Sequence, residues 1–260
     1  MIKEAIILAG GPGTRLQTVV SDVPKCLAPV NGIPFINFII AYLKNEGVTR
    51  FIFSLGYKSE IVTDYLDVHF NELEKVYVIE KEQLGTGGAV KKACEAVTAQ
   101  DVVIVNGDTI FNISLPDLLQ AHHSKNAACT IALNHMYDFE RYGTAEFNKD
   151  GIITAFHEKK ICSKGYINGG IYILNVSEFL KKDLPEKFSF EKDYLEKYVA
   201  EQTFIGVVFY SYFTDIGVPE DYEAFQKKYS DSPKAVKSNS SDDNITTIIE
   251  AIGTFFDLLH

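Results

Sequence analysis

Residues 2–16 read IKEAIILAGGPGTRL, and they place a short apolar strand, Ile2 to Leu8, directly before a glycine-rich loop. A glycine loop after a first strand can bring backbone N–H groups close to a phosphate, because glycine has no side chain that would keep the ligand away. Arg15 adds a planar cation that can bind two phosphate oxygens at once. The stretch therefore predicts a polyphosphate site at the start of an α/β fold.

Two other glycine loops do not fit this stretch. The dinucleotide fingerprint G-x-G-x-x-G needs a third glycine where Leu16 stands, and the Walker A loop needs a Gly-Lys-Ser/Thr sequence that this loop does not have. Lys25, in Pro24-Lys25, supplies a second cation shortly after Arg15. The alternative is a tight strand–helix turn with no ligand, which would not require cations at both positions.

Beyond the loop, strand-like and helix-like segments alternate up to about residue 126. The expected strands are 50–55, 76–79 and 101–105, and the expected helices are 34–46, 59–70, 86–97 and 114–126, the last with Ser114 as its N-cap. This alternation predicts a mostly parallel sheet that helices cover on both faces. From about residue 127, strand-like segments separated by turns predict added antiparallel or mixed strands. Helices 176–182, 189–199 and 219–229 and a strand 204–210 are expected to follow.

Composition limits the classes of partner. The chain has 260 residues, 46% of them hydrophobic and 23% charged, with a net charge of -10, which argues against binding to nucleic acid or to an anionic membrane. No apolar run approaches the ~20 residues of a membrane helix, and the N-terminus lacks the pattern of a signal peptide. We therefore expect a cytoplasmic protein, with its four scattered cysteines reduced.

Three segments follow from the composition along the chain. Residues 1–229 form the α/β domain, residues 230–243 are rich in Ser, Asp and Lys and predict a flexible linker, and residues 244–260 predict an amphipathic helix. Because that helix has a large apolar surface, it must dock on this chain or on a second copy. A homodimer through this helix is therefore one expectation.

The motifs, taken in order, resemble those of the sugar-1-phosphate nucleotidyltransferases. L-A-G-G-x-G-T-R-L followed by P-K is similar to that family's signature. The further motifs are LGTGG at 84–88, NGD at 106–108, YGT at 142–144, EK at 158–159, NGG at 168–170 and FTDIG at 213–217. The resemblance covers residues 1 to about 228. It implies a Rossmann-like three-layer nucleotidyltransferase fold, with a mostly parallel central sheet and added antiparallel strands, for the 1–229 domain.

Two aspartates are candidate metal ligands. Asp108 follows a buried strand at the carboxyl edge of the sheet, where open α/β sheets bind ligands, and Asp215 lies in a Thr-Asp-Ile-Gly turn. A hard cation such as Mg²⁺ prefers one or two carboxylates together with phosphate oxygens. The resemblance assigns both aspartates this role and implies Mg²⁺ as the cofactor. With Arg15, expected on the β- and γ-phosphates, and Lys25, nearer the α-phosphate, they form the expected catalytic set.

Glu80 is the candidate for base recognition, because it ends the strand before a second glycine loop, residues 84–88 (LGTGG). A carboxylate only accepts hydrogen bonds, and guanine offers it two adjacent N–H donors, whereas uracil and thymine offer one N–H between two carbonyl groups. GTP is therefore the favoured nucleotide, and Thr86 is expected to be the N-cap of the following helix. The expected nucleotide contacts are Leu8, Ala9, Gly10, Gly11, Gly13, Thr14, Arg15, Lys25, Glu80, Gly85, Thr86, Asn106 and Asp108.

The sugar-phosphate contacts come from the resemblance alone. It implies that Lys159 holds the phosphate of the sugar and that Glu158 and Asn168 contact the sugar hydroxyl groups. Gly143 and Gly169 would allow the sugar to approach closely. Lys160 stands where the family often has proline, so the sequence departs from the family's pattern at this turn.

The resemblance implies an enzyme that transfers a nucleoside monophosphate from a nucleoside triphosphate to a sugar 1-phosphate and releases pyrophosphate. Residues 21–29 (SDVPKCLAP) are similar to the motif of members that make GDP-D-glycero-α-D-manno-heptose for surface polysaccharides. Mannose 1-phosphate with GTP and glucose 1-phosphate with UTP are alternatives. A non-catalytic nucleotide-sugar sensor would be expected to lack some of the catalytic set, and a metal-dependent glycosyltransferase would carry Asp-x-Asp in place of the NGD motif at 106–108.

Overall fold

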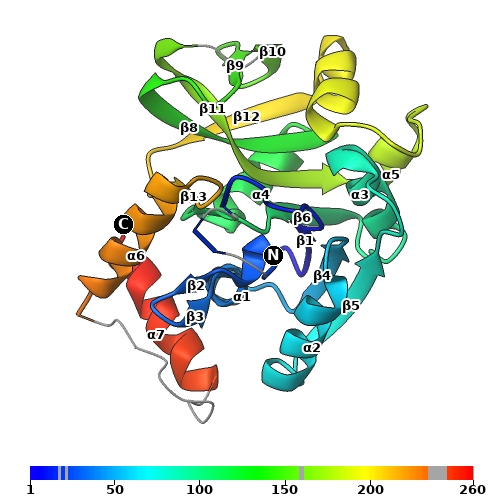
Figure 1. The fold of residues 1–260 in the computed structure, drawn as a ribbon. Coiled ribbons are helices and arrows are strands. Elements are labelled where there is room, and N and C mark those ends of the chain that lie inside the picture. Colours follow the sequence, from blue (N-terminus) through cyan, green and yellow to red (C-terminus); the bar gives the residue numbers. More distant parts are fainter. Residues whose placement is uncertain (17–18, 21–22, 158–160, 234–244, 260) are drawn as a thin grey trace.

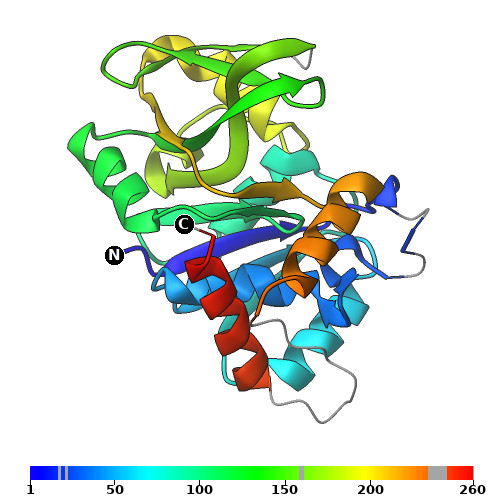
Figure 2. The same cartoon turned by 90° about the vertical axis from the view of Figure 1, so that its left-hand side faces the viewer.

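A nine-stranded sheet runs through the molecule, with helices packed on both of its faces (Figures 1 and 2). The computed structural model describes all residues except 17–18, 21–22, 158–160, 234–244 and 260. Four neighbouring strands are parallel, in the order β6 (Asp101–Asn106), β1 (Glu4–Ala9), β4 (Arg50–Leu55) and β5 (Glu74–Ile79). The predicted parallel core is confirmed.

The added strands extend the sheet on the β6 side. The long strand β11 (Cys162–Asn175) pairs antiparallel with β6 and with β8 (Cys129–Phe139), and β12 (Phe204–Phe209) runs parallel to β8. The sheet ends in β9 (Thr144–Phe147) and β10 (Ile153–His157). These are the antiparallel and mixed strands that the change of pattern after residue 127 predicts.

The side chains of the sheet alternate between two apolar layers, because successive residues of a strand point to opposite faces. Ala5 and Ile7 of β1 belong to one layer, and Ile6 belongs to the other. The first layer includes α1 (Phe35–Asn45), α2 (Ser59–His69), α4 (Leu115–Ser124) and α6 (Pro219–Ser230). The second includes α3 (Gly85–Cys94), α5 (Val176–Leu180) and the π-helix η3 (Phe190–Glu196).

Several element ends differ from the sequence prediction. The single helix expected at 189–199 is instead η3 followed by a short 3-10 helix, η4 (Val199–Glu201), and α3 ends at Cys94 rather than Val97. The Ser114 cap is confirmed, since its side chain accepts a hydrogen bond from the Asp117 N–H at 3.3 Å. Four smaller elements are η2 (Lys25–Leu27), β2 (Pro29–Val30), β3 (Ile33–Pro34) and the ribbon strand β7 (Thr109–Phe111), which pairs with β13 (Phe213–Asp215).

The C-terminal helix α7 (Ile245–Asp257) packs against α1 and α6 of its own chain (Figure 2). The Phe255 ring meets the Phe225 and Tyr229 rings edge-on, with centroids 6.2 and 5.2 Å apart. The Asn112 side chain, which directly follows β7, donates to the Phe256 carbonyl at 2.9 Å. The predicted amphipathic helix therefore docks in cis, whereas a homodimer stays a prediction.

Most of the predicted linker, residues 234–243, and Asn244, the first residue of the predicted C-terminal helix, lie outside the described residues. Ser230, placed in the linker by the sequence, is instead the last residue of α6. Within the described part of the chain, no helix is both long and apolar enough to cross a membrane. The cysteines are free thiols, and burial raises the pKa of Cys26 and Cys94 to about 12.

Replacing Phe255 by Ala should destabilise the protein by about 3–5 kcal/mol, because the ring is 2% exposed and its removal leaves a cavity between α6 and α7. Urea unfolding followed by circular dichroism measures the change. Leu258→Ala is the matched control, because Leu258 is 56% exposed and its loss should cost less than about 0.5 kcal/mol. Equal effects of the two changes would contradict the docking of α7.

Candidate active site

The glycine loop, which follows β1, lies beside the end of β6 because β1 and β6 end level with each other. Leu8 of β1 pairs with Asn106 of β6, and the Gly107 N–H donates to the Leu8 carbonyl at 2.8 Å. A Cβ at Gly107 would lie 2.8 Å from that same oxygen, so only glycine fits. This register brings Asp108 next to the loop, at the carboxyl edge of the parallel strands where such sheets bind ligands.

A cavity of about 290 Å³ opens over the glycine loop. It is lined by Leu8, Ala9, Gly11, Pro12, Gly13, Thr14, Arg15, Lys25, Cys26, Gly107, Asp108 and Gly217. Gly13 has a φ of +61°, and a Cβ there would lie 2.8 Å from the Lys25 Cβ, so this glycine is required both by the turn and by the approach of Lys25. Eight of the predicted nucleotide contacts therefore share one cavity: Leu8, Ala9, Gly11, Gly13, Thr14, Arg15, Lys25 and Asp108.

The Lys25 ammonium lies between the two predicted metal ligands. Its Nζ is 2.5 Å from Asp108 Oδ2 and 3.6 Å from Asp215 Oδ1. The two aspartates meet because β7, which follows Asp108, pairs antiparallel with β13, so that Thr109 faces Asp215. Asp215 Oδ1 also accepts the Gly217 N–H at 2.6 Å.

Asp215 is held where its negative charge is unfavourable. Burial raises the pKa of the Asp215 carboxyl group, and the negative charge of Asp108 raises it further. Lys25, the Gly217 N–H and Arg15 oppose this effect without cancelling it. Burial and the charge of Asp108 thus make the ionised form of Asp215 unfavourable, and a cation bound next to it would favour that form.

The geometry fits a divalent cation of the Mg²⁺ type. The Asp108 and Asp215 oxygens converge on one positive group, the Lys25 ammonium, so both carboxylates can face a single cation. No group of three or more His, Cys, Asp or Glu side chains able to hold a metal occurs among the described residues. A cation held by these two carboxylates would therefore take its other ligands from phosphate oxygens and water, as Mg²⁺ does.

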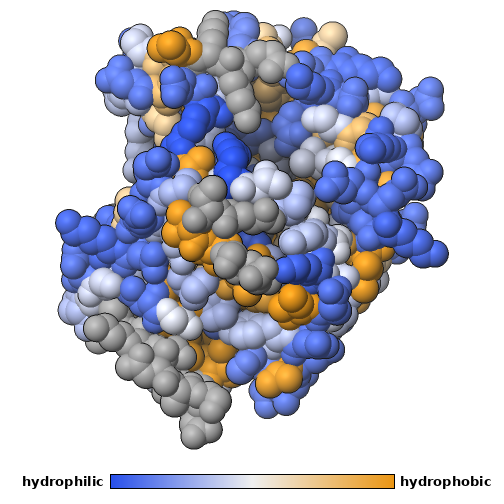
Figure 3. All heavy atoms as spheres, in the orientation of Figure 1, coloured by the Kyte–Doolittle hydropathy of each residue, from blue (hydrophilic) through white to orange (hydrophobic). Residues whose placement is uncertain are grey.

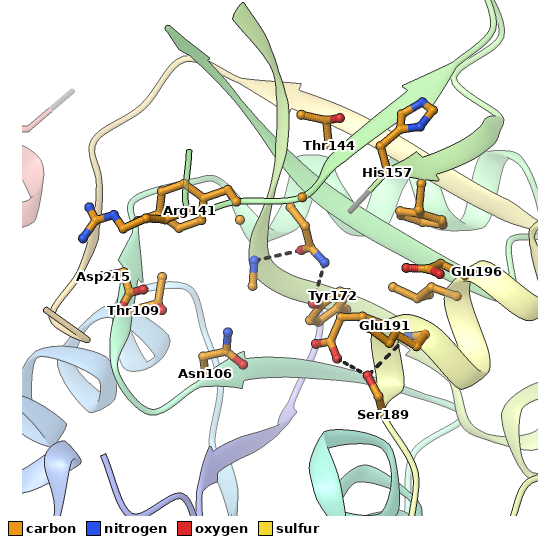
Figure 4. Close-up of a pocket in the computed structure, with 18 of the residues that line it drawn as sticks. Asn106, Thr109, Arg141, Thr144, His157, Tyr172, Ser189, Glu191, Glu196 and Asp215 are labelled. Atoms are coloured by element: carbon orange, nitrogen blue, oxygen red, sulfur yellow. Dashed lines mark hydrogen bonds between the residues drawn. The ribbon is translucent and has the colours of Figure 1, made fainter. Parts of the chain in front are cut away.

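A larger cavity of about 430 Å³ adjoins the first one, and Arg15 and Asp215 line it. The space-filling surface is hollowed below the β8–β11 part of the molecule, with mainly hydrophilic side chains around the hollow (Figure 3). Thr109 and Asp215 lie at one side of this cavity, and Ser189, Glu191 and Glu196 lie at the other (Figure 4). The cavity also contains the predicted residues Asn106, Gly143, Asn168 and Gly169.

The structure describes three of the five predicted sugar contacts, Gly143, Asn168 and Gly169. The Asn168 side chain donates to the Tyr172 hydroxyl at 2.8 Å and accepts the Gly170 N–H at 3.0 Å, so its orientation is fixed. A Cβ at Gly169 would lie 2.3 Å from the Phe111 ring, so this glycine is already required by the packing of the protein itself. Glu158 and Lys159 lie outside the described residues.

The second glycine loop approaches the first one through Glu80. Glu80 Oε2 accepts the Leu84 N–H at 3.0 Å, and Oε1 would be 3.2 Å from a Cβ on Gly10. Glu80 thus lies between the two loops, next to the predicted contact Gly10. Gly85 has a φ of +74°, and a Cβ there would lie 2.5 Å from the Phe188 carbonyl oxygen.

Thr86 is not the N-cap of α3, so that prediction was wrong. Leu84 occupies the cap position, and Thr86 lies within the first turn. The Thr86 hydroxyl instead donates to Glu191 Oε2 at 2.8 Å and accepts the Phe190 N–H at 2.9 Å. A partner more than a hundred residues away overrides the local capping preference.

Sequence reasoning missed several residues of the larger cavity, notably Arg141, Tyr172, Ser189 and Glu191. The Arg141 guanidinium pairs with Asp221 at 2.6 Å, and this contact links the β8–β9 connection to α6. Arg141 directly precedes the YGT motif at 142–144, so a longer motif could have included it. Ser189 and Glu191 lie in a segment whose pattern indicated only a helix.

A sequence model of the nucleotidyl transferase family matches residues 4–232. The chain belongs to this family. The match includes both glycine loops, Asp108 and Asp215, and it ends before α7. The part of the chain that the family model matches therefore contains the sheet and the lining of both cavities, and α7 lies outside it.

Two relatives and one solved structure are informative. The D-glycero-alpha-D-manno-heptose 1-phosphate guanylyltransferase of Aneurinibacillus thermoaerophilus is 46% identical over 225 residues, which are 86% of this chain and 97% of that protein. The protein of the same name from Campylobacter jejuni is 42% identical over 85% of this chain and 98% of its own. The structure of HddC from Yersinia pseudotuberculosis complexed with GMP-PN is 34% identical, with a TM-score of 0.77, and covers 88% of this chain and 100% of that one.

Proposed function

We propose that this nucleotidyl transferase transfers GMP from GTP to D-glycero-α-D-manno-heptose 1-phosphate. It would release pyrophosphate and form GDP-D-glycero-α-D-manno-heptose, a surface polysaccharide precursor, in the cytoplasm. The observation that carries the proposal is the contact of Lys25 with Asp108 and Asp215 beside a phosphate-type glycine loop. The names of the two relatives support the choice of GTP and of the heptose.

The chemistry explains why the site has cations and no obvious general base. The nucleophile is an oxygen of the sugar 1-phosphate, and because its second pKa is about 6, it is already largely ionised at neutral pH. The reaction instead requires that two anions come together and that the attack on the α-phosphorus is in line with the leaving pyrophosphate. Positive charge and positioning therefore carry the catalysis.

The residues of the smaller cavity would bind the triphosphate. The N–H groups of the glycine loop and the Arg15 guanidinium would hold the β- and γ-phosphates, and Lys25 would contact the α-phosphate. A Mg²⁺ ion held by Asp108 and Asp215 would supply further neutralisation of the phosphate charge. The larger cavity, which Arg15 and Asp215 also line, would place the sugar phosphate against the α-phosphorus.

Glu80 would recognise the base. Its Oε2 is committed to the Leu84 N–H, and its Oε1 lies 3.5 Å from the Ser54 hydroxyl, beside the glycine loop. From this position the carboxylate would accept hydrogen bonds from the guanine edge, which uracil cannot supply as a pair.

Mixing the protein with GTP, Mg²⁺ and the heptose 1-phosphate should release pyrophosphate, measured by a coupled phosphate assay. Asp108→Asn should lower kcat by about 100- to 1000-fold, because it removes a carboxylate that would hold the Mg²⁺ ion against the reacting phosphates. Asp150→Asn, at an exposed turn, is the control and should leave the rate unchanged. Faster pyrophosphate release with GTP and mannose 1-phosphate, or with UTP and glucose 1-phosphate, would contradict the proposed choice of substrates. Near-native turnover of Asp108→Asn would contradict the role of this carboxylate.

Glu80→Gln should reduce the preference for GTP over UTP, expressed as a ratio of kcat/KM values, by about 10- to 100-fold. The reason is that the amide replaces one acceptor by a donor and removes the charge. Glu82→Gln, two residues away and exposed, is the matched control. An unchanged nucleotide preference in the Glu80 variant would show that guanine is recognised elsewhere.

A further inference from the structure

Two hydroxyl groups hold one oxygen of the Glu191 carboxylate. Thr86 Oγ1 donates to its Oε2 at 2.8 Å, and Ser189 Oγ donates to the same oxygen at 2.9 Å. Each hydroxyl in turn accepts a backbone N–H, Thr86 from Phe190 at 2.9 Å and Ser189 from Lys192 at 3.2 Å. Each of those N–H groups uses one lone pair of a hydroxyl, and the hydroxyl proton is donated to Glu191.

The other carboxylate oxygen, Oε1, has no donor among the described residues, and Glu191 lines the larger cavity. The segment that carries Glu191 is also held firmly. The Gly87 N–H donates to the Phe188 carbonyl at 3.0 Å, and the Phe188 N–H donates to the Leu84 carbonyl at 2.9 Å. The cavity wall thus presents a preorganised hydrogen-bond acceptor on a rigid support.

The two ends of this cavity differ in chemistry. Arg15 lies at the end that adjoins the phosphate loop, together with Asp215 and its neighbour Lys25. The opposite wall carries the carboxylates of Glu191 and Glu196 (Figure 4), and Lys192 also lines the cavity. An anionic phosphate suits the first end, and the neutral hydroxyl groups of a sugar suit the second, since a hydroxyl donates to a carboxylate in a charge-assisted hydrogen bond.

We propose that Glu191 determines sugar specificity, its Oε1 accepting a hydrogen bond from a hydroxyl of the exocyclic arm, at the end of the sugar remote from the phosphate. A heptose differs from a hexose in this arm by one additional CHOH group. The inference rests on the proposed function and deepens it, because it assigns recognition of the longer arm to the wall formed by η3. Ser189 and Thr86 act through Glu191 and are positioning residues for it.

Glu191→Gln is the sharpest test, because the two hydroxyl donors dictate how the amide is oriented. The Gln carbonyl must accept from Thr86 and Ser189, so its NH₂ group replaces Oε1, and an acceptor becomes a donor without a change of shape. With GTP, the ratio of kcat/KM for heptose 1-phosphate to that for mannose 1-phosphate should fall about 5- to 10-fold, and in Glu191→Ala about 10- to 100-fold. The KM for GTP should change less than about twofold, because the base and the triphosphate bind elsewhere.

The control is Glu178→Gln, a charge removal on α5 where Glu178 pairs with exposed Lys181 at 2.6 Å. Its sugar ratio should equal that of the unchanged protein. Ser189→Ala should lower the ratio in the same direction as Glu191→Gln, and Ser189→Thr should restore it, since threonine keeps the donor. A merely structural role of Ser189 would not change the sugar ratio.

The outcomes separate this inference from the proposed function. If the unchanged protein releases no pyrophosphate with either sugar phosphate, both are overturned. If it does so and Glu191→Gln leaves the ratio unchanged, or lowers kcat/KM equally for both sugars, only the inference is overturned. A rise in the KM for GTP with an unchanged sugar ratio would likewise overturn it, and would assign Glu191 to the nucleotide loop.

Discussion

One ion triad organises the site, namely the Lys25 ammonium between the carboxylates of Asp108 and Asp215. The level ends of β1 and β6 and the short β7–β13 ribbon are what bring its members together. Two carboxylates held this close repel each other, and burial makes the charge of Asp215 still less favourable. Such an arrangement costs stability in the protein alone, and under the proposed function a bound cation would offset this cost.

The two cavities differ in the charges that line them. Arg15, Lys25 and Asp108 line the smaller cavity beside the glycine loop, whereas the far wall of the larger one carries the carboxylates of Glu191 and Glu196. The Thr86–Glu191 hydrogen bond joins the second glycine loop to that wall, so the proposed base site and the proposed sugar site share one rigid support. Both proposed substrates would therefore be positioned by parts of the protein that hold one another in place.

The sequence predicted what depends on local pattern. The glycine loop, the alternation of strands and helices, the added strands after residue 127 and the Ser114 cap needed only short stretches of chain. It did not predict the three-residue strands of the β7–β13 ribbon, since neither is long enough to show a period. Thr86 was assigned as a cap because its true partner, Glu191, is remote in sequence, and the Arg141–Asp221 pair was missed for the same reason.

The stability of Asp215→Asn, in EDTA and without nucleotide, tests the central claim most directly. The pKa of Asp215 is raised in the folded protein, so ionised Asp215 destabilises the folded state at pH values above that pKa. This cost disappears below the pKa of an unfolded aspartate, about 3.9, where both states are protonated. Urea unfolding at pH 7 should show the variant more stable by about 0.5–2 kcal/mol, with the gain disappearing at acidic pH, while Asp150→Asn shows no gain. An Asp215→Asn variant that is equally or less stable than the unchanged protein at pH 7 would contradict the account.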